Sequence, residues 1–160
     1  MEVVDSQNVN DSNGELNKSP LLLYIEKREK EWSENLAVIS EKMKTLQGIL
    51  DCESELYNIR QSCLESYHQV LRMISKKTQQ LRPLQAQRYN FYKVNSQIRY
   101  SSDTAIGAQV NSDLTDYMYD IELLNNHGKF LQDTLKGIDS MIYSIKNRIE
   151  LEKLVHGFDL

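Results

Sequence analysis

Apolar residues recur at alternating intervals of three and four along most of the 160-residue chain. This spacing keeps one narrow stripe of each helix apolar and is typical of coiled-coil packing. The cleanest such seam lies near the carboxyl end and consists of Leu114, Tyr117, Ile121, Leu124, Gly128, Leu131, Leu135, Ile138, Ile142, Ile145 and Ile149. Because only six glycines and two prolines interrupt the chain, the pattern predicts an all-α fold of long, coiled-coil-like helices that form a helical bundle.

A second seam covers the first half of the chain. Its first part comprises Ile25, Glu29, Trp32, Leu36, Ile39, Met43, Leu46 and Leu50. After the polar stretch at 51–55 the spacing resumes with Leu56, Ile59, Cys63, Tyr67, Val70, Ile74, Lys77, Leu81 and Leu84. We interpret 51–55 as a hinge and expect Gly48 to weaken the helix only slightly. Whether residues 20–92 form one helix or two stays open.

Composition and seam pattern together divide the chain into five segments. Residues 1–19 are rich in Asn, Asp and Ser and are expected to be a disordered tail. An acidic coiled-coil helix is predicted for 20–55, and a basic helix ending in an aromatic element for 56–92. A polar loop over 93–112 then leads to a C-terminal oligomerisation helix over 113–157.

Residues with special backbone preferences mark the expected helix ends. Ser19 followed by Pro20 predicts a helix start, because serine caps free amide groups and proline suits the first helical position. Ser112 predicts a second start, since acidic residues follow it in the first turn. Pro83 is expected to kink its helix or begin a new turn, and Gly157 to cap the last helix.

Long helices with narrow seams bury little surface per residue, so part of the core is expected to come from other copies of the chain. Isoleucine at both seam positions favours assemblies larger than a dimer. The residues expected to join the copies are Leu131, Leu135, Ile138, Ile142, Ile145 and Ile149.

The net charge of -4 conceals a strongly basic middle segment. Residues 60–100 carry eight Lys or Arg and one acidic residue, a net charge of 8 - 1 = +7. Residues 1–59 carry six basic and twelve acidic residues (-6), and residues 101–160 carry five and ten (-5). Such a segment between acidic arms suggests a polyanionic ligand or an acidic protein partner.

The sequence gives no indication of catalysis, a metal site or a cofactor. The three histidines, His68, His127 and His156, are far apart, and there is no closely spaced His/Cys set or glycine-rich phosphate loop. We therefore expect a protein that is not an enzyme. Neither a secretory signal nor an apolar run of about 18 residues is present, so we expect a cytoplasmic protein with Cys52 and Cys63 as free thiols.

Residues 81–100 combine three arginines and a lysine with four aromatic residues. Cations displace counterions from phosphates and aromatic rings stack on unpaired bases, so this mixture indicates binding of single-stranded nucleic acid with little sequence preference. The candidate contact residues are Arg72, Lys76, Lys77, Arg82, Arg88, Tyr89, Phe91, Tyr92, Lys93 and Arg99. The alternative is a coiled-coil adaptor or scaffold with no nucleic-acid role, whose basic segment packs against its own acidic helices.

Two stretches resemble the UvsY-type recombination mediators of tailed phages. In LQAQRYNFY, residues 84–92, Arg88 falls on an arginine of the family pattern and Phe91 and Tyr92 on its aromatic pair. Ala86 stands where the family often has a lysine. The closing helix, LKGIDSMIYSIKNRIELEKLVHG at 135–157, is similar to the family's last helix. The likeness covers roughly residues 60–157, and the acidic segment before it is longer than the family usually has.

The resemblance implies a non-enzymatic accessory factor. It would bind single-stranded DNA and help load a recombinase onto DNA coated by single-strand-binding protein, contacting both proteins. It would assemble as a homo-oligomer, a ring of six or seven copies, in the host cell cytoplasm if phage-encoded. A ring would place many basic segments together, so that weak individual sites act at high effective concentration.

Overall fold

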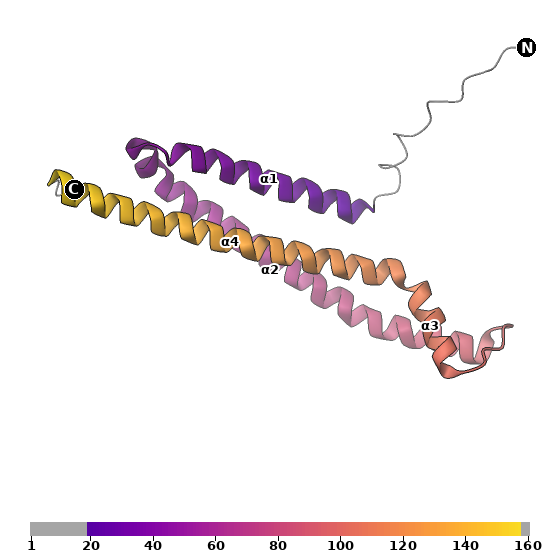
Figure 1. The fold of residues 1–160 in the computed structure, drawn as a ribbon. Coiled ribbons are helices and arrows are strands. Elements are labelled where there is room, and N and C mark those ends of the chain that lie inside the picture. Colours follow the sequence, from indigo (N-terminus) through magenta and orange to yellow (C-terminus); the bar gives the residue numbers. More distant parts are fainter. Residues whose placement is uncertain (1–18, 158–160) are drawn as a thin grey trace, which may run out of the picture.

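The computed structural model describes residues 19–157 and confirms the all-α fold, with no strand in that range. Helix α1 (Pro20–Lys42) and the long helices α2 (Leu46–Asn90) and α4 (Thr115–His156) run side by side (Figure 1). A π-helical turn, η1 (Phe91–Asn95), and the short helix α3 (Asp103–Asp113) lie at the far end, which α1 does not reach. Most of the tail expected at 1–19 falls outside the described residues.

Helix α1 begins where the sequence predicted. The Ser19 side chain accepts a hydrogen bond from the Leu22 backbone amide at 3.1 Å, and Pro20 occupies the first turn. The helix ends at Lys42, and Thr45 caps α2 by accepting a bond from the Gly48 amide at 3.1 Å. Residues 20–92 therefore form two helices, and the hinge predicted at 51–55 is wrong, because those residues lie inside α2.

The turn at 43–45 shifts the register of the seam. Leu46 and Leu50, which continue the spacing of α1, are 46% and 43% exposed. Ile49 and Cys52 face the core instead, at 1% and 0% exposure. Because the chain reverses direction at this turn, a different helix face points inward after it. The spacing of three and four residues therefore does not predict buried positions across the turn.

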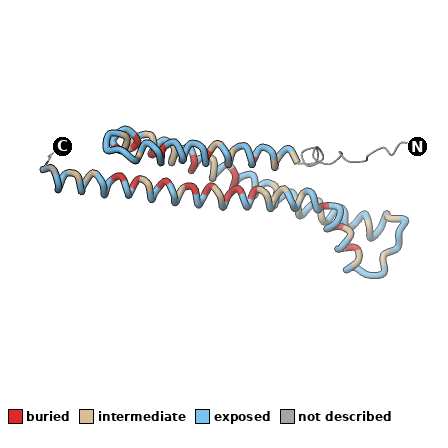
Figure 2. The backbone as a smooth tube through the Cα atoms, turned by 45° about the horizontal axis from the view of Figure 1, so that its top comes forward, coloured by how far each residue is buried: buried red, intermediate tan, exposed pale blue. Residues whose placement is uncertain are grey.

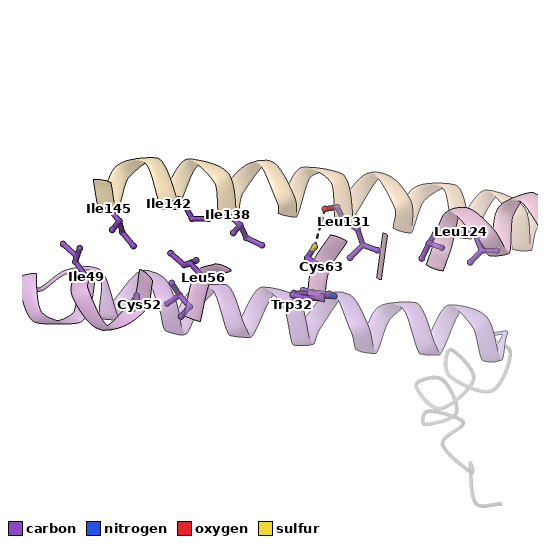
Figure 3. Packing of buried hydrophobic residues seen from close by; sticks show 12 residues of the cluster. Trp32, Ile49, Cys52, Leu56, Cys63, Leu124, Leu131, Ile138, Ile142 and Ile145 are labelled. Carbon is purple, nitrogen blue, oxygen red and sulfur yellow. Dashed lines mark hydrogen bonds between the residues drawn. The ribbon is translucent and has the colours of Figure 1, made fainter. Parts of the chain in front are cut away.

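The main core runs along the contact of α2 and α4, with α1 packed over it (Figure 3). Buried residues recur every seven positions, as in Leu124, Leu131, Ile138 and Ile145 of α4. They face residues of α1 and α2, namely Trp32, Ile39, Ile49, Cys52, Leu56, Cys63 and Val70. Figure 2 shows this buried stripe on the inner side of helices whose outer sides are exposed. Knobs-into-holes packing stays a prediction.

The residues expected to join copies of the chain belong largely to this core. Leu131, Ile138, Ile142 and Ile145 are buried in it, with Leu135 and Ile149 partly buried against it. Placing this seam between chains was wrong for the fold described here, because α1 and α2 already cover it. The sequence did not predict that one chain supplies three helices to a single seam, with α2 running antiparallel to α1 and α4.

A second, smaller core lies at the far end and holds α3. Ile106, Val110 and Leu114 are buried there against residues of α2, η1 and the following loop, namely Leu81, Leu84, Tyr89, Tyr92 and Tyr100. The polar loop predicted over 93–112 is therefore wrong in its second half. Ser112 lies inside α3 rather than capping the next helix, and the side chain of Ser102 accepts a bond from the Ala105 amide at 3.2 Å as the N-cap of α3.

Helix α4 continues past the turn between α1 and α2 (Figure 1). Leu151, Leu154 and Val155 on this projecting end are 59%, 81% and 72% exposed. Gly157 caps the helix in the left-handed conformation with φ 64°, as the sequence predicted. Pro83 lies inside α2, which continues beyond it to Asn90.

Both cysteines are free and fully buried, which gives a test of the core. Burial raises the pKa of the Cys63 thiol to about 11 and raises that of Cys52. Only the thiolate reacts, and at pH 8 about one Cys63 side chain in a thousand would be ionised. We expect a thiol reagent to modify native protein slowly and guanidinium-unfolded protein at both positions within the mixing time. Rapid modification of the native protein would contradict this packing.

Candidate nucleic-acid interface

The predicted contact residues are spread over the length of α2 from Arg72 onward, η1 and the loop before α3. Arg72 and Lys76 are exposed, and their spacing of four residues places them on one side of α2. Arg82, Arg88 and Arg99 are also exposed, nearer the far end of the molecule. None of these five cations forms an ion pair with another residue in 19–157, although the nearby charge of Arg88 adds to the hydrogen bonds that lower the pKa of Asp113.

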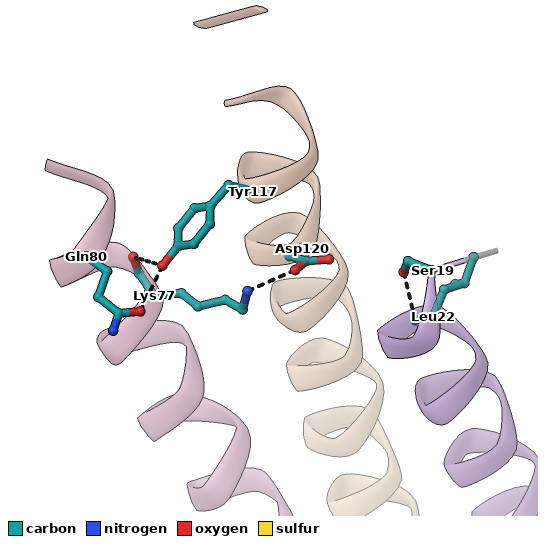
Figure 4. A network of polar contacts seen from close by, with 6 residues as sticks. All are labelled: Ser19, Leu22, Lys77, Gln80, Tyr117 and Asp120. Carbon is teal, nitrogen blue, oxygen red and sulfur yellow. Dashed lines mark hydrogen bonds and ion pairs between the residues drawn. The ribbon is translucent and has the colours of Figure 1, made fainter. Parts of the chain in front are cut away.

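Lys77 is held by its own chain. Its Nζ lies 2.8 Å from Asp120 Oδ2 on α4 and 4.6 Å from the centre of the Tyr117 ring. The Tyr117 hydroxyl contacts α2 in turn, donating to the Lys77 carbonyl oxygen at 3.1 Å and lying 3.0 Å from Gln80 Oε1 (Figure 4). The predicted phosphate contact at Lys77 is therefore not supported, because this lysine joins α2 to α4.

Two further cations of the basic segment also pair within the chain. Arg60 Nε lies 2.6 Å from Asp139 Oδ1 on α4. Lys93 Nζ lies 3.6 Å from Asp103 Oδ1 on α3 and 5.4 Å from the Tyr89 ring centre, and Tyr89 together with Asp103 raises the pKa of Lys93. These exposed pairs contribute little to stability, but they leave less positive charge for a ligand than the sequence suggests.

The aromatic residues divide into structural and accessible rings. Tyr89 and Tyr92 are partly buried against the second core. The Tyr92 and Tyr100 rings pack edge to face, with 5.4 Å between their centres. The Tyr92 hydroxyl donates to Asp113 Oδ2 at 2.5 Å, which raises the pKa of Tyr92 and lowers that of Asp113. Phe91 differs because 46% of its surface is exposed. Of the three rings proposed to stack on bases, only Phe91 is classed as exposed, whereas Tyr89 and Tyr92 are partly buried.

A groove lies beside Phe91 at the end of α2. It has a volume of about 510 Å³ and is lined by Leu84, Gln87, Arg88, Asn90, Phe91 and Asn95. The spacing of most of these residues by three, four or seven positions places them on one side of the helix end. A cation and an exposed ring therefore lie at one concave surface. The sequence predicted that cations and rings occur in the same segment, but it did not predict the groove.

Helix α3 is the part of this region that the sequence analysis missed. The signal was present, because Ser102 precedes Asp103 and the apolar Ile106, Val110 and Leu114 follow at intervals of four. Asn, Ser and Gly within the segment concealed it. Helix α3 packs against the end of α2 and thereby fixes the aromatic element in place.

Two further kinds of site can be judged for the described residues, a metal site and a membrane span. Residues 19–157 contain no cluster of three or more His, Cys, Asp or Glu side chains that could hold a metal ion. No helix in that range is both long and apolar enough to cross a membrane.

Comparison with protein families distinguishes between the two interpretations of the basic segment, binding of single-stranded nucleic acid and an adaptor with no nucleic-acid role. Residues 60–158 match the family model of UvsY, the recombination, repair and ssDNA binding protein. The chain belongs to the UvsY family. The matched range contains the exposed cations, the groove and most of α2 with all of α4, whereas α1 lies outside it. Searches among curated proteins and among solved structures each found no match.

Membership in the UvsY family places the chain among proteins of recombination and repair that bind single-stranded DNA. The basic segment at 60–100 lies within the matched range.

Proposed function

We propose that this UvsY-family protein is a recombination mediator that helps load a recombinase onto single-stranded DNA coated by single-strand-binding protein. The observation that carries the proposal is the family match over a region with five exposed, unpaired cations. Arg72, Lys76, Arg82, Arg88 and Arg99 would contact phosphates.

The proposal includes a homo-oligomer, for which the exposed end of α4 provides the surface. Leu151, Leu154 and Val155 lie near the end of α4 and are 59%, 81% and 72% exposed. Contiguous exposed apolar side chains at a helix end are typical of association sites. An assembly joined there would leave the cations of each copy exposed, and linked sites bind one strand with high avidity.

The direct test is fluorescence anisotropy of a labelled single-stranded oligonucleotide at several salt concentrations, with a duplex of equal length as control. Binding that prefers the single strand and falls linearly with salt on logarithmic axes supports the proposal. Addition of a recombinase and its single-strand-binding protein then tests loading, read as faster filament formation on coated DNA. Absence of binding at low salt would favour the adaptor, since three cations already pair with the chain's own acids.

Arg88→Ala is expected to weaken binding of all single-stranded sequences about tenfold, because a charge-assisted hydrogen bond to phosphate is lost. The logarithmic salt dependence should become shallower by about 0.7 for the one lost phosphate contact. Arg88→Lys keeps the charge and should preserve the salt dependence. Lys146→Ala removes an exposed cation from α4 outside the basic segment and should change neither quantity. A change of base preference in Arg88→Ala would refute the phosphate role.

A further inference from the structure

The groove at the end of α2 contains more than a cation and a ring. Gln87, Asn90 and Asn95 line it beside Arg88 and Phe91. None of these three amide side chains has a hydrogen-bonding partner within residues 19–157, and Arg88 has no ion pair there. The amide groups and the guanidinium therefore face the groove with their donors and acceptors unused by the fold.

The local backbone sets these groups around a concave surface. Phe91 and Asn95 are the first and last residues of the π-helical turn η1. A π-turn widens the helix relative to the α-helical α2 before it, and such turns often accompany functional sites. On the opposite side Tyr92 is bound to Asp113 and packs on the second core, so the turn is held in position while Phe91 stays exposed.

The combination of groups defines the chemistry of a ligand. The Leu84 and Phe91 side chains provide an apolar surface for a flat molecule. The three amides offer both donors and acceptors, which match the mixed edge of a nucleobase. The Arg88 guanidinium suits an adjoining phosphate. An acidic peptide would satisfy the guanidinium but leave the apolar surface and most of the amides without partners.

We propose that this groove binds one unstacked base of single-stranded DNA, with the ring of Phe91 against the base face, the amides at its edge and Arg88 at its phosphate. The inference rests on the proposed binding of single-stranded DNA and adds a nucleotide site to it. A base within a duplex is paired and stacked on both faces, so it cannot enter. The groove is thus the element that discriminates single strands from duplexes.

The experiment compares two oligomers of equal length and charge in anisotropy titrations with the full-length protein. One is oligothymidylate, and the other consists of abasic deoxyribose phosphates. Stacking of one base on an aromatic side chain is worth a factor of about ten, so the wild type should bind the oligothymidylate at least about tenfold more tightly. In Phe91→Ala this preference should fall to about twofold, while the affinity for the abasic oligomer and the salt dependence stay unchanged.

Tyr143→Ala is the matched control, because it removes an aromatic ring that is 68% exposed on α4, and it should keep the wild-type preference. Circular dichroism of both variants checks that the fold is intact. Equal binding of both oligomers by the wild type would overturn the groove but leave the proposed function standing, whereas no binding of either would overturn the proposed function itself. Weaker binding of both oligomers alike by Phe91→Ala would show a structural role and also overturn the inference.

Discussion

Ile138→Asp is expected to unfold the protein. Ile138 is 0% exposed in the main core between α2 and α4. The substitution loses about 2–3 kcal/mol of apolar burial and places a carboxylate at a fully buried position of the hydrophobic core, at a further cost of several kcal/mol. The sum is comparable with the whole stability of a typical domain, about 5–15 kcal/mol. The helical circular dichroism signal and the cooperative thermal transition should both be lost.

The matched control is Leu154→Asp, which replaces another branched apolar residue of α4 with aspartate at a position that is 81% exposed. It should leave the helical signal and the melting temperature close to wild type. If the projecting end of α4 joins copies of the chain, light scattering should report a lower mass for Leu154→Asp. If Ile138→Asp instead stayed folded and only its assembly mass fell, Ile138 would pack between chains. That result would contradict its burial in the core of a single chain.

Gly48→Ala is expected to destabilise the protein by about 2–3 kcal/mol, as overpacking at a close approach does. A β-carbon at this position would overlap the backbone carbonyl oxygen of Lys42 and lie 2.9 Å from Thr45 Oγ1. The Thr45 cap and the Lys42 end of α1 would have to move apart. Helix propensity alone predicts the opposite sign, because alanine is the better helix former by about 1 kcal/mol. Urea unfolding monitored by circular dichroism measures the difference.

Gly137→Ala provides the comparison. Gly137 is exposed inside α4, and an added β-carbon meets nothing within 4 Å. This change should stabilise the protein by about 0.5–1 kcal/mol through the lower flexibility of the unfolded chain. If both variants were stabilised alike, the tight turn between α1 and α2 would be wrong.

Charged residues within the apolar seams show how far sequence reasoning reached. Glu29 and Lys77 are charged residues at seam positions, and the seam pattern alone gives no reason for either. In the structure Glu29 Oε1 lies 2.9 Å from Nδ1 of the buried His127, and Lys77 pairs with Asp120. Both partners lie on α4, dozens of residues away in the chain. The pattern located the exceptions, but only the packing of helices identified their partners.

In the candidate interface too, the sequence located the residues and the packing of helices identified their partners. The sequence concentrated cations and rings in one segment, and the arginine at position 88 and the ring at 91 are indeed exposed beside a groove. It did not distinguish these from Lys77 or Tyr92, which have similar local contexts but are bound by α4 and α3. Whether a cation is available depends on which acidic side chain lies opposite.

The sequence by itself determined the helical fold, the first and last caps and the segregation of charge, because all three depend on residues within a few positions of one another. Only the tertiary structure decided that the isoleucine seam is covered within the chain, that Gly48 permits a tight turn, and which cations remain unpaired. These outcomes depend on the direction in which each helix returns after its turn. The direction of each returning helix depends on the area that all three helices bury together and on the steric clashes between them. Neither can be calculated from a short stretch of sequence.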